Sequence, residues 1–148
     1  MEDWIAAEIL IVEDNPHDAE LMIRAIKKNN IANKFFIAED GEEALDFIFC
    51  RNKFTERSSY APPRVIFLDL KLPKVNGLEV LQVIKSDSKT KTLPVVMITS
   101  SREDTDIKKA YELGANSYVV KPVNFNDFYS AMSNTGLYWL LVNVSPKS

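Results

Sequence analysis

The chain has 148 residues, of which 46% are hydrophobic and 26% charged, proportions typical of one soluble domain with a hydrophobic core. Its net charge of −3, with lysines scattered along the chain, disfavours a nucleic-acid binder, which usually carries a basic face. The amino terminus lacks a basic region before an apolar stretch, and no apolar run approaches the roughly 20 residues of a spanning helix, so we expect a cytoplasmic protein.

Apolar segments alternate with helix-period segments five times along the chain. Short β-branched runs predict buried strands at 9–12, 34–38, 65–68, 93–99 and 117–120. Helices are expected at about 16–29, 42–50, 78–85, 103–113 and from 125 onward. Capping residues support them, since Asn15 and Asn124 suit helix starts and Gly114 suits a helix end. Residues 51–63 read as a polar loop, and the single cysteine, Cys50, as ordinary core packing.

Five strand–helix units without a second composition zone predict a single domain over residues 1–148, with a core at about 9–134 and a carboxyl-terminal extension at about 135–148. The predicted fold is a doubly wound α/β domain with a five-stranded parallel sheet in the flavodoxin-like order 2-1-3-4-5. In this order the first and third strands are neighbours. Ligands of such folds bind outside the carboxyl ends of the strands, at the point where the strand order reverses.

Polar residues stand at the ends of four of these strands: Glu13 with Asp14, Asp69, Thr99 and Lys121. Three carboxylates at one sheet edge repel one another unless a cation lies between them. Mg²⁺ suits such oxygen ligands, and the chain has no histidine or cysteine cluster for zinc. A crevice with acids, a hydroxyl and an ammonium therefore suits one divalent cation and one phosphoryl group.

Asp69 is the best candidate for a nucleophile toward a phosphoryl donor, because it stands alone at the end of the third strand. Glu13 and Asp14 are better interpreted as metal ligands. Lys121 and Thr99 would neutralise and contact the phosphoryl oxygens. Each motif alone is weak, since an acidic pair after a strand is often only a helix-capping loop. Their placement at the ends of four parallel strands makes chance a poor explanation.

At these residues the chain resembles the receiver domain of two-component response regulators, over about 9–134. The segments that carry the resemblance are "ILIVEDNP", "VIFLDLKLPKVNGLEVL", "VVMITSS" and "GANSYVVKP". Pro73 and Gly77 fall where the family has a proline and a glycine. The longer 51–63 segment and the carboxyl-terminal extension resemble the small cyanobacterial phytochrome response regulators, which lack an output domain.

The resemblance implies a non-enzymatic phosphoprotein in which a sensor histidine kinase phosphorylates Asp69. The closer resemblance implies a kinase of the phytochrome type, and kinases of other sensor types fit the sequence equally well. It also implies a Mg²⁺ site made of Asp14, Asp69, the carbonyl of Lys71 and, through a water, Glu13. Thr99 would contact the phosphoryl group, Lys121 would pair with it, and Tyr118 would turn inward on activation. A cis peptide bond before Pro122 is implied as well. The output would be a change in protein–protein interactions.

Two classes of rival function, an enzyme and a scaffolding domain, and one question of assembly stay open at this point. A cofactor enzyme or hydrolase of the same fold would need a phosphate-binding loop after the first strand, where "EDNPHD" stands. A phosphatase with two aspartates would need an acid at Lys71. A purely scaffolding domain would not need the intact acids. The tail after Gly136 is apolar on nearly all sides, which predicts a symmetric homodimer through the last helix and the tail, or a tail folded onto its own domain.

Overall fold

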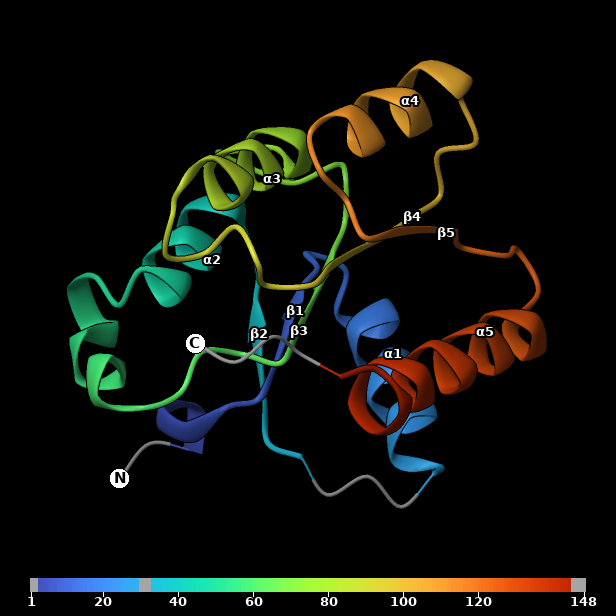
Figure 1. The fold of residues 1–148 in the computed structure, drawn as a ribbon. Coiled ribbons are helices and arrows are strands. Elements are labelled where there is room, and N and C mark those ends of the chain that lie inside the picture. The colour runs from blue at the N-terminus through green and yellow to red at the C-terminus, as the bar shows by residue number, and fades with distance from the viewer. Residues whose placement is uncertain (1–2, 30–32, 145–148) are drawn as a thin grey trace.

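The computed structural model describes residues 3–29 and 33–144, and it confirms the predicted parallel sheet (Figure 1). The strands are β1 (Ile9–Val12), β2 (Phe35–Ala38), β3 (Val65–Leu68), β4 (Val95–Thr99) and β5 (Ser117–Val120). They pair in parallel in the order β2-β1-β3-β4-β5. Every residue of β1, β3 and β4 is buried, which explains why these strands read as unbroken apolar runs.

Five helices connect the strands: α1 (Pro16–Lys27), α2 (Gly41–Ile48), α3 (Gly77–Ser86), α4 (Asp104–Glu112) and α5 (Phe125–Leu137). The predicted caps are confirmed at Asn15 and Asn124, whose side chains accept hydrogen bonds from backbone N–H groups of the first helical turn. Gly114 follows α4 with φ +105°, the left-handed conformation expected of it. The helix starts therefore follow from local sequence.

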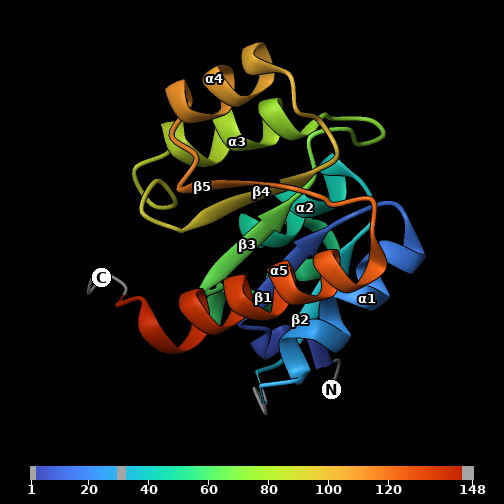
Figure 2. The ribbon, with the colours of Figure 1, turned by 90° about the vertical axis from the view of Figure 1, so that its right-hand side faces the viewer.

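The helices form a layer on each face of the sheet (Figures 1 and 2). Helices α1 and α5 lie together on one face, and α2, α3 and α4 cover the other. Successive strand residues point to opposite faces, so Ile9 and Ile11 join the core under α1 and α5, whereas Leu10 and Val12 join the core on the other side. Both cores are built from one sheet, which holds the carboxyl ends of the strands in fixed register.

The predicted loop at 51–63 is wrong in part, because residues Asn52–Ser59 form a 3₁₀ helix, η2. Phe54 and Arg57 of this helix are buried, and Arg57 stacks 3.6 Å above the ring centroid of Phe47. Cys50 is not plain core either. It is partly exposed, has φ 55°, and its Sγ accepts a 3.7 Å hydrogen bond from Arg57 Nη1. Two buried side chains in a polar stretch are enough to anchor the segment on α2.

After α5 the chain continues as one π-helical turn, η3 (Tyr138–Val142), and packs on its own domain. Leu140 is 1% exposed, and its carbonyl accepts a 2.8 Å hydrogen bond from Arg64 Nη2. Gly136 lies so close to α1 that a Cβ there would be 2.9 Å from Ile26 Cγ1. The fold-back alternative therefore holds for the first part of the tail, while Val142 and Val144 stay exposed.

Throughout the described segments, the helices are too short or too polar to span a membrane.

Candidate functional site

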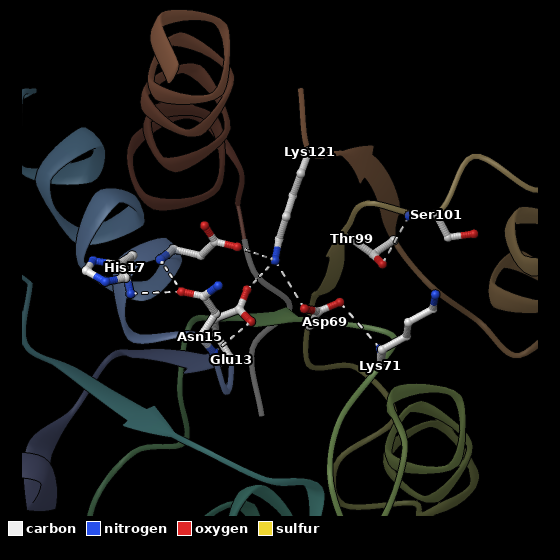
Figure 3. A network of polar contacts seen from close by, with 9 residues as sticks. Glu13, Asn15, His17, Asp69, Lys71, Thr99, Ser101 and Lys121 are labelled. Atoms are coloured by element: carbon white, nitrogen blue, oxygen red, sulfur yellow. Dashed lines mark hydrogen bonds and ion pairs between the residues drawn. The ribbon is translucent and has the colours of Figure 1, made fainter. Parts of the chain in front are cut away.

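The structure brings the three predicted acids together at the carboxyl edge of the sheet, and Figure 3 shows Glu13 and Asp69 there. Glu13 and Asp14 follow β1, and Asp69 follows the neighbouring strand β3. One carboxylate oxygen from each lies within 4.8 Å of the others. Glu13 and Asp69 are buried and Asp14 is exposed, so the cluster is open to solvent on one side.

Lys121, which follows β5, extends its ammonium group into this cluster (Figure 3). Its Nζ lies 3.1 Å from Asp69 Oδ2 and donates a short hydrogen bond to Glu13 Oε1. The Lys121 side chain is only 10% exposed. The predicted cation thus reaches both buried acids across the intervening strand ends.

A fourth acid, Asp18, also belongs to the site, and the sequence reasoning missed it. Its Oδ2 lies 3.0 Å from Lys121 Nζ, although the two residues are 103 positions apart in the chain. The available signal was its place in the first turn of the helix that Asn15 caps, directly after the acidic pair. The first turn of a helix after a strand faces the same crevice as the end of the strand.

The electrostatics of the site reflect this crowding. Burial raises the pKa of the Glu13 carboxyl from 4.5 to about 7; the hydrogen bond from Lys121 opposes the rise, and the charge of Asp69 adds to it. Burial alone would lower the pKa of the Lys121 ammonium, but the hydrogen bond to Glu13 and the charges of Asp69 and Glu13 outweigh it and raise that pKa. The site therefore has more negative charge than its one ammonium compensates, which favours a bound cation.

Thr99 and Tyr118 occupy the two neighbouring strands on the other side of Asp69. Thr99 is fully buried at the end of β4, and its Oγ1 accepts a long 3.4 Å hydrogen bond from the N–H of Ser101. Tyr118 on β5 is half-buried and donates its hydroxyl to the carbonyl of Ser101, at 3.0 Å. Ser101 Oγ in turn donates to Asp106 Oδ2 at 2.6 Å. One loop between β4 and α4 thus connects the two predicted switch residues.

The β3–α3 loop forms the remaining wall. The N–H of Lys71 lies 3.4 Å from Asp69 Oδ1, and Lys71 lines the same hollow as Asp14. Gly77 begins α3 directly under this loop, where a Cβ would lie 2.1 Å from the carbonyl oxygen of Asp69. Any larger residue at Gly77 would displace the backbone that presents Asp69.

The predicted cis bond between Lys121 and Pro122 is wrong, because every peptide bond among the described residues is trans. The two isomers before proline differ by only about 0.5–1 kcal/mol, so the local sequence does not fix the choice. His17 is exposed on α1 and donates its backbone N–H to Asn15 Oδ1, as expected for a solvated helix position.

The donor set fits a hard divalent cation. Three carboxylates from two strand ends supply oxygen ligands, and the open side of the cluster leaves room for waters or phosphate oxygens. Nitrogen and sulfur ligands are absent from the cluster, which argues against zinc. An acid pair, a lone acid, a buried hydroxyl and an ammonium at four strand ends of a doubly wound sheet are the arrangement expected of a receiver domain.

Comparison with known proteins agrees with this class. The chain matches the family described as the response regulator receiver domain over residues 9–133, and it belongs to that family. It is 34% identical to the response regulator Rcp1 of a Synechocystis strain over 132 residues, which cover 89% of this chain and 88% of Rcp1.

Solved structures give the same result. The Mn²⁺-bound form of Rcp1 superposes with a TM-score of 0.87 at 33% identity, covering 94% of this chain and 98% of Rcp1. The phosphorylated cyanobacterial phytochrome response regulator RcpA has a TM-score of 0.87 at 30% identity, covering 96% of this chain and 100% of RcpA. The bacteriophytochrome response regulator AtBRR is 49% identical with a TM-score of 0.71, covering 92% of this chain and 96% of AtBRR. The chain is therefore a two-component receiver domain similar to phytochrome response regulators.

Proposed function

We propose that this protein is a phosphorylation-activated response regulator in which Asp69 accepts a phosphoryl group from a sensor histidine kinase. The observation that carries the proposal is the contact of Lys121 Nζ with Asp69 Oδ2 at 3.1 Å, beside the acid cluster. In the strand order β1-β3-β4-β5, Asp69 is the acid of the cluster that follows β3, the strand next to β4 with its buried Thr99 hydroxyl. A family relative, RcpA, has been crystallised in a phosphorylated form.

In the proposed reaction a carboxylate oxygen of Asp69 forms a bond to phosphorus. The bond between phosphorus and the imidazole nitrogen of the donor histidine breaks, and its electron pair stays on that nitrogen. Lys121 offsets the negative charge on the transferred oxygens, and Thr99 offers a hydroxyl to one of them. These groups act by position and charge, so the protein need not move a proton to Asp69.

We propose Mg²⁺ as the resident cation, held by Glu13, Asp14, Asp69 and the carbonyl of Lys71. When bound, it would neutralise phosphoryl oxygens and the excess charge of the cluster. The carboxylate-only side-chain set and the shared hollow of Asp14 and Lys71 support this assignment. The relative Rcp1 has been solved in a Mn²⁺-bound form, and Mn²⁺, like Mg²⁺, prefers oxygen ligands.

Phosphorylation would then change the surface that the protein presents to a partner. The phosphoryl group adds negative charge beside the β4–α4 loop, whose Ser101 is hydrogen-bonded to both Thr99 and Tyr118. We propose that this loop closes on the phosphoryl group and that Tyr118 repacks inward. The face formed by α4, β5 and α5 would carry the signal to a protein partner.

The test of the phosphoacceptor is the intact mass after incubation with acetyl phosphate and Mg²⁺. The wild-type protein should gain one phosphoryl group. Over the same incubation time, Asp69→Asn should gain none. Asp127→Asn, which removes an exposed acid on α5, is the matched control and should behave as wild type. Unchanged phosphorylation of Asp69→Asn would remove the basis of the assignment.

For the donor, we propose a phytochrome-type histidine kinase, because RcpA and AtBRR are phytochrome response regulators by name and AtBRR is 49% identical to this chain. A time course of phosphotransfer from purified histidine kinases of phytochrome and other sensor types would identify the partner. Transfer that is fastest from a kinase of another sensor class would reject the phytochrome assignment and leave Asp69 unaffected.

We also propose that the protein forms a symmetric homodimer through α5 and the tail. Apolar side chains remain exposed there after the fold-back, namely Leu137, Tyr138, Val142 and Val144. Because Leu140 is part of the core, truncation at Gly136 would confound folding with assembly. Light scattering of the phosphorylated protein and of Val142→Asp is the better comparison. A monomer mass for both at tens of micromolar would reject the dimer.

A further inference from the structure

Lys121 meets a third carboxylate that the proposed function does not use. An ammonium group has three N–H donors, and here each one has a separate acid: Glu13 from the end of β1, Asp69 from the end of β3, and Asp18 from α1. All three donors are therefore satisfied by protein groups. The ammonium is fixed at the junction of three elements.

The three acids differ in what else they do. Glu13 and Asp69 belong to the cluster whose oxygens lie within 4.8 Å of one another, and Asp18 does not. A cation in that cluster, or a phosphoryl group on Asp69, would draw oxygens of Glu13 and Asp69 away from Lys121. Asp18 would then be the partner that still holds the ammonium.

Local structure keeps Asp18 in place. It lies in the first turn of α1, where its backbone N–H donates to the capping Asn15 Oδ1 at 3.2 Å. A carboxylate in the first turn of a helix is favoured by the helix dipole. The Asp18 side chain is 32% exposed and the Lys121 side chain 10% exposed, so their contact costs Asp18 little desolvation.

We propose that Asp18 is a positioning residue that holds Lys121 Nζ beside Asp69 during phosphoryl transfer. The inference rests on the proposed function of Asp69. Asp18 acts from outside the acid cluster, so it orients the ammonium without competing for the cation. Its removal would let the Lys121 side chain sample orientations away from the transferred oxygens, which slows transfer but leaves cation binding unchanged.

The test compares phosphorylation rates by acetyl phosphate at saturating Mg²⁺, read as intact mass. Asp18→Asn should slow phosphorylation about fivefold, the scale of one partly buried ion pair, while the Mg²⁺ midpoint stays within about twofold. Asp18→Glu should restore most of the rate. The matched control is Glu20→Gln, the same change of charge on the same helix, because within residues 3–29 and 33–144 the ion pair of Glu20 is the exposed one with Arg24. It should keep the wild-type rate.

A second measurement follows Lys121 directly. Limited acylation with an amine-reactive reagent should label Lys121 several-fold more in Asp18→Asn than in wild type, with Lys85, which donates to the carbonyl of Leu93 at 2.7 Å, as the internal reference. A wild-type rate in Asp18→Asn, or unchanged Lys121 labelling, would overturn the positioning role. The positioning role would also be overturned if Asp18→Asn slowed phosphorylation equally in a Lys121→Met background. Absence of any phosphorylation in wild type would instead reject the proposed function.

Discussion

Replacing Glu13 by glutamine in the metal-free protein tests the electrostatics of the site most directly. Glu13 is 2% exposed at the side chain, and its pKa is raised from 4.5 to about 7, first of all by burial. Because the native state holds this proton more tightly than the unfolded state, Glu13 contributes stability that is complete below pH 4.5 and is lost as the pH rises through 7. Glutamine resembles the protonated carboxyl and does not titrate.

The size of the effect follows from the shift. One extra bound proton in the native state lowers the free energy of unfolding by about 1.4 kcal/mol per pH unit between the two pKa values. Over the interval from 4.5 to about 7, this amounts to about 3 kcal/mol for the wild-type protein. The Glu13→Gln variant should lack this part of the pH dependence, whatever its stability at any single pH.

Urea unfolding in EDTA at pH 5, 6, 7 and 8 measures how the free energy of unfolding changes with pH in the wild type and in Glu13→Gln. Glu20→Gln is the control, because it removes an exposed acid of α1 that is not part of the site. The free energy of unfolding should fall from pH 5 to pH 7 more steeply in wild type and Glu20→Gln than in Glu13→Gln. Parallel curves for all three proteins would refute the claim that burial of Glu13 sets its protonation. Saturating Mg²⁺ should also flatten the wild-type curve, since the bound cation stabilises the ionised form.

Three further predictions concern packing and backbone geometry and are tested by urea unfolding. Leu140→Ala should lower the free energy of unfolding by about 2–5 kcal/mol because Leu140 is buried against the domain, whereas exposed Val142→Ala should change it by less than about 0.5; equal effects would contradict the fold-back of the tail. Tyr118→Phe should cost about 0.5–1.5 kcal/mol through loss of the hydrogen bond to the Ser101 carbonyl, and an unchanged midpoint would argue against that bond in solution. Gly114→Ala should cost about 1 kcal/mol or more because the position has φ +105°; a stabilised variant would show that the left-handed turn is not maintained.

The sequence by itself determined the five strands, the helix starts and the edge of the sheet where the acids lie. These features depend on local signals: unbroken β-branched runs mark buried parallel strands, and Asn15 and Asn124 supply caps within a few residues of the groups they bond. A parallel sheet then forces the residues after each strand to one edge, so Glu13, Asp14 and Asp69 had to meet.

Tertiary structure decided what depends on the rotation and packing of whole elements. Asp18 reaches Lys121 only because α1 packs beside α5 with its first turn over the strand ends, a contact between residues 103 positions apart. Arg57 is buried in a polar segment because its guanidinium stacks on Phe47, which no periodicity of the segment indicates.

The peptide bond before Pro122 and the tail are two more features that local sequence left open and the three-dimensional structure decided. The two isomers before proline differ by only about 0.5–1 kcal/mol in favour of trans, so the dipeptide alone did not support the expected cis bond, and this bond is trans. The apolar tail was compatible with a partner or with its own domain, since both bury the same side chains. The small side chain of Gly136 against Ile26 lets α5 approach α1 closely enough for Leu140 to enter the core, and that close approach exists only in three dimensions.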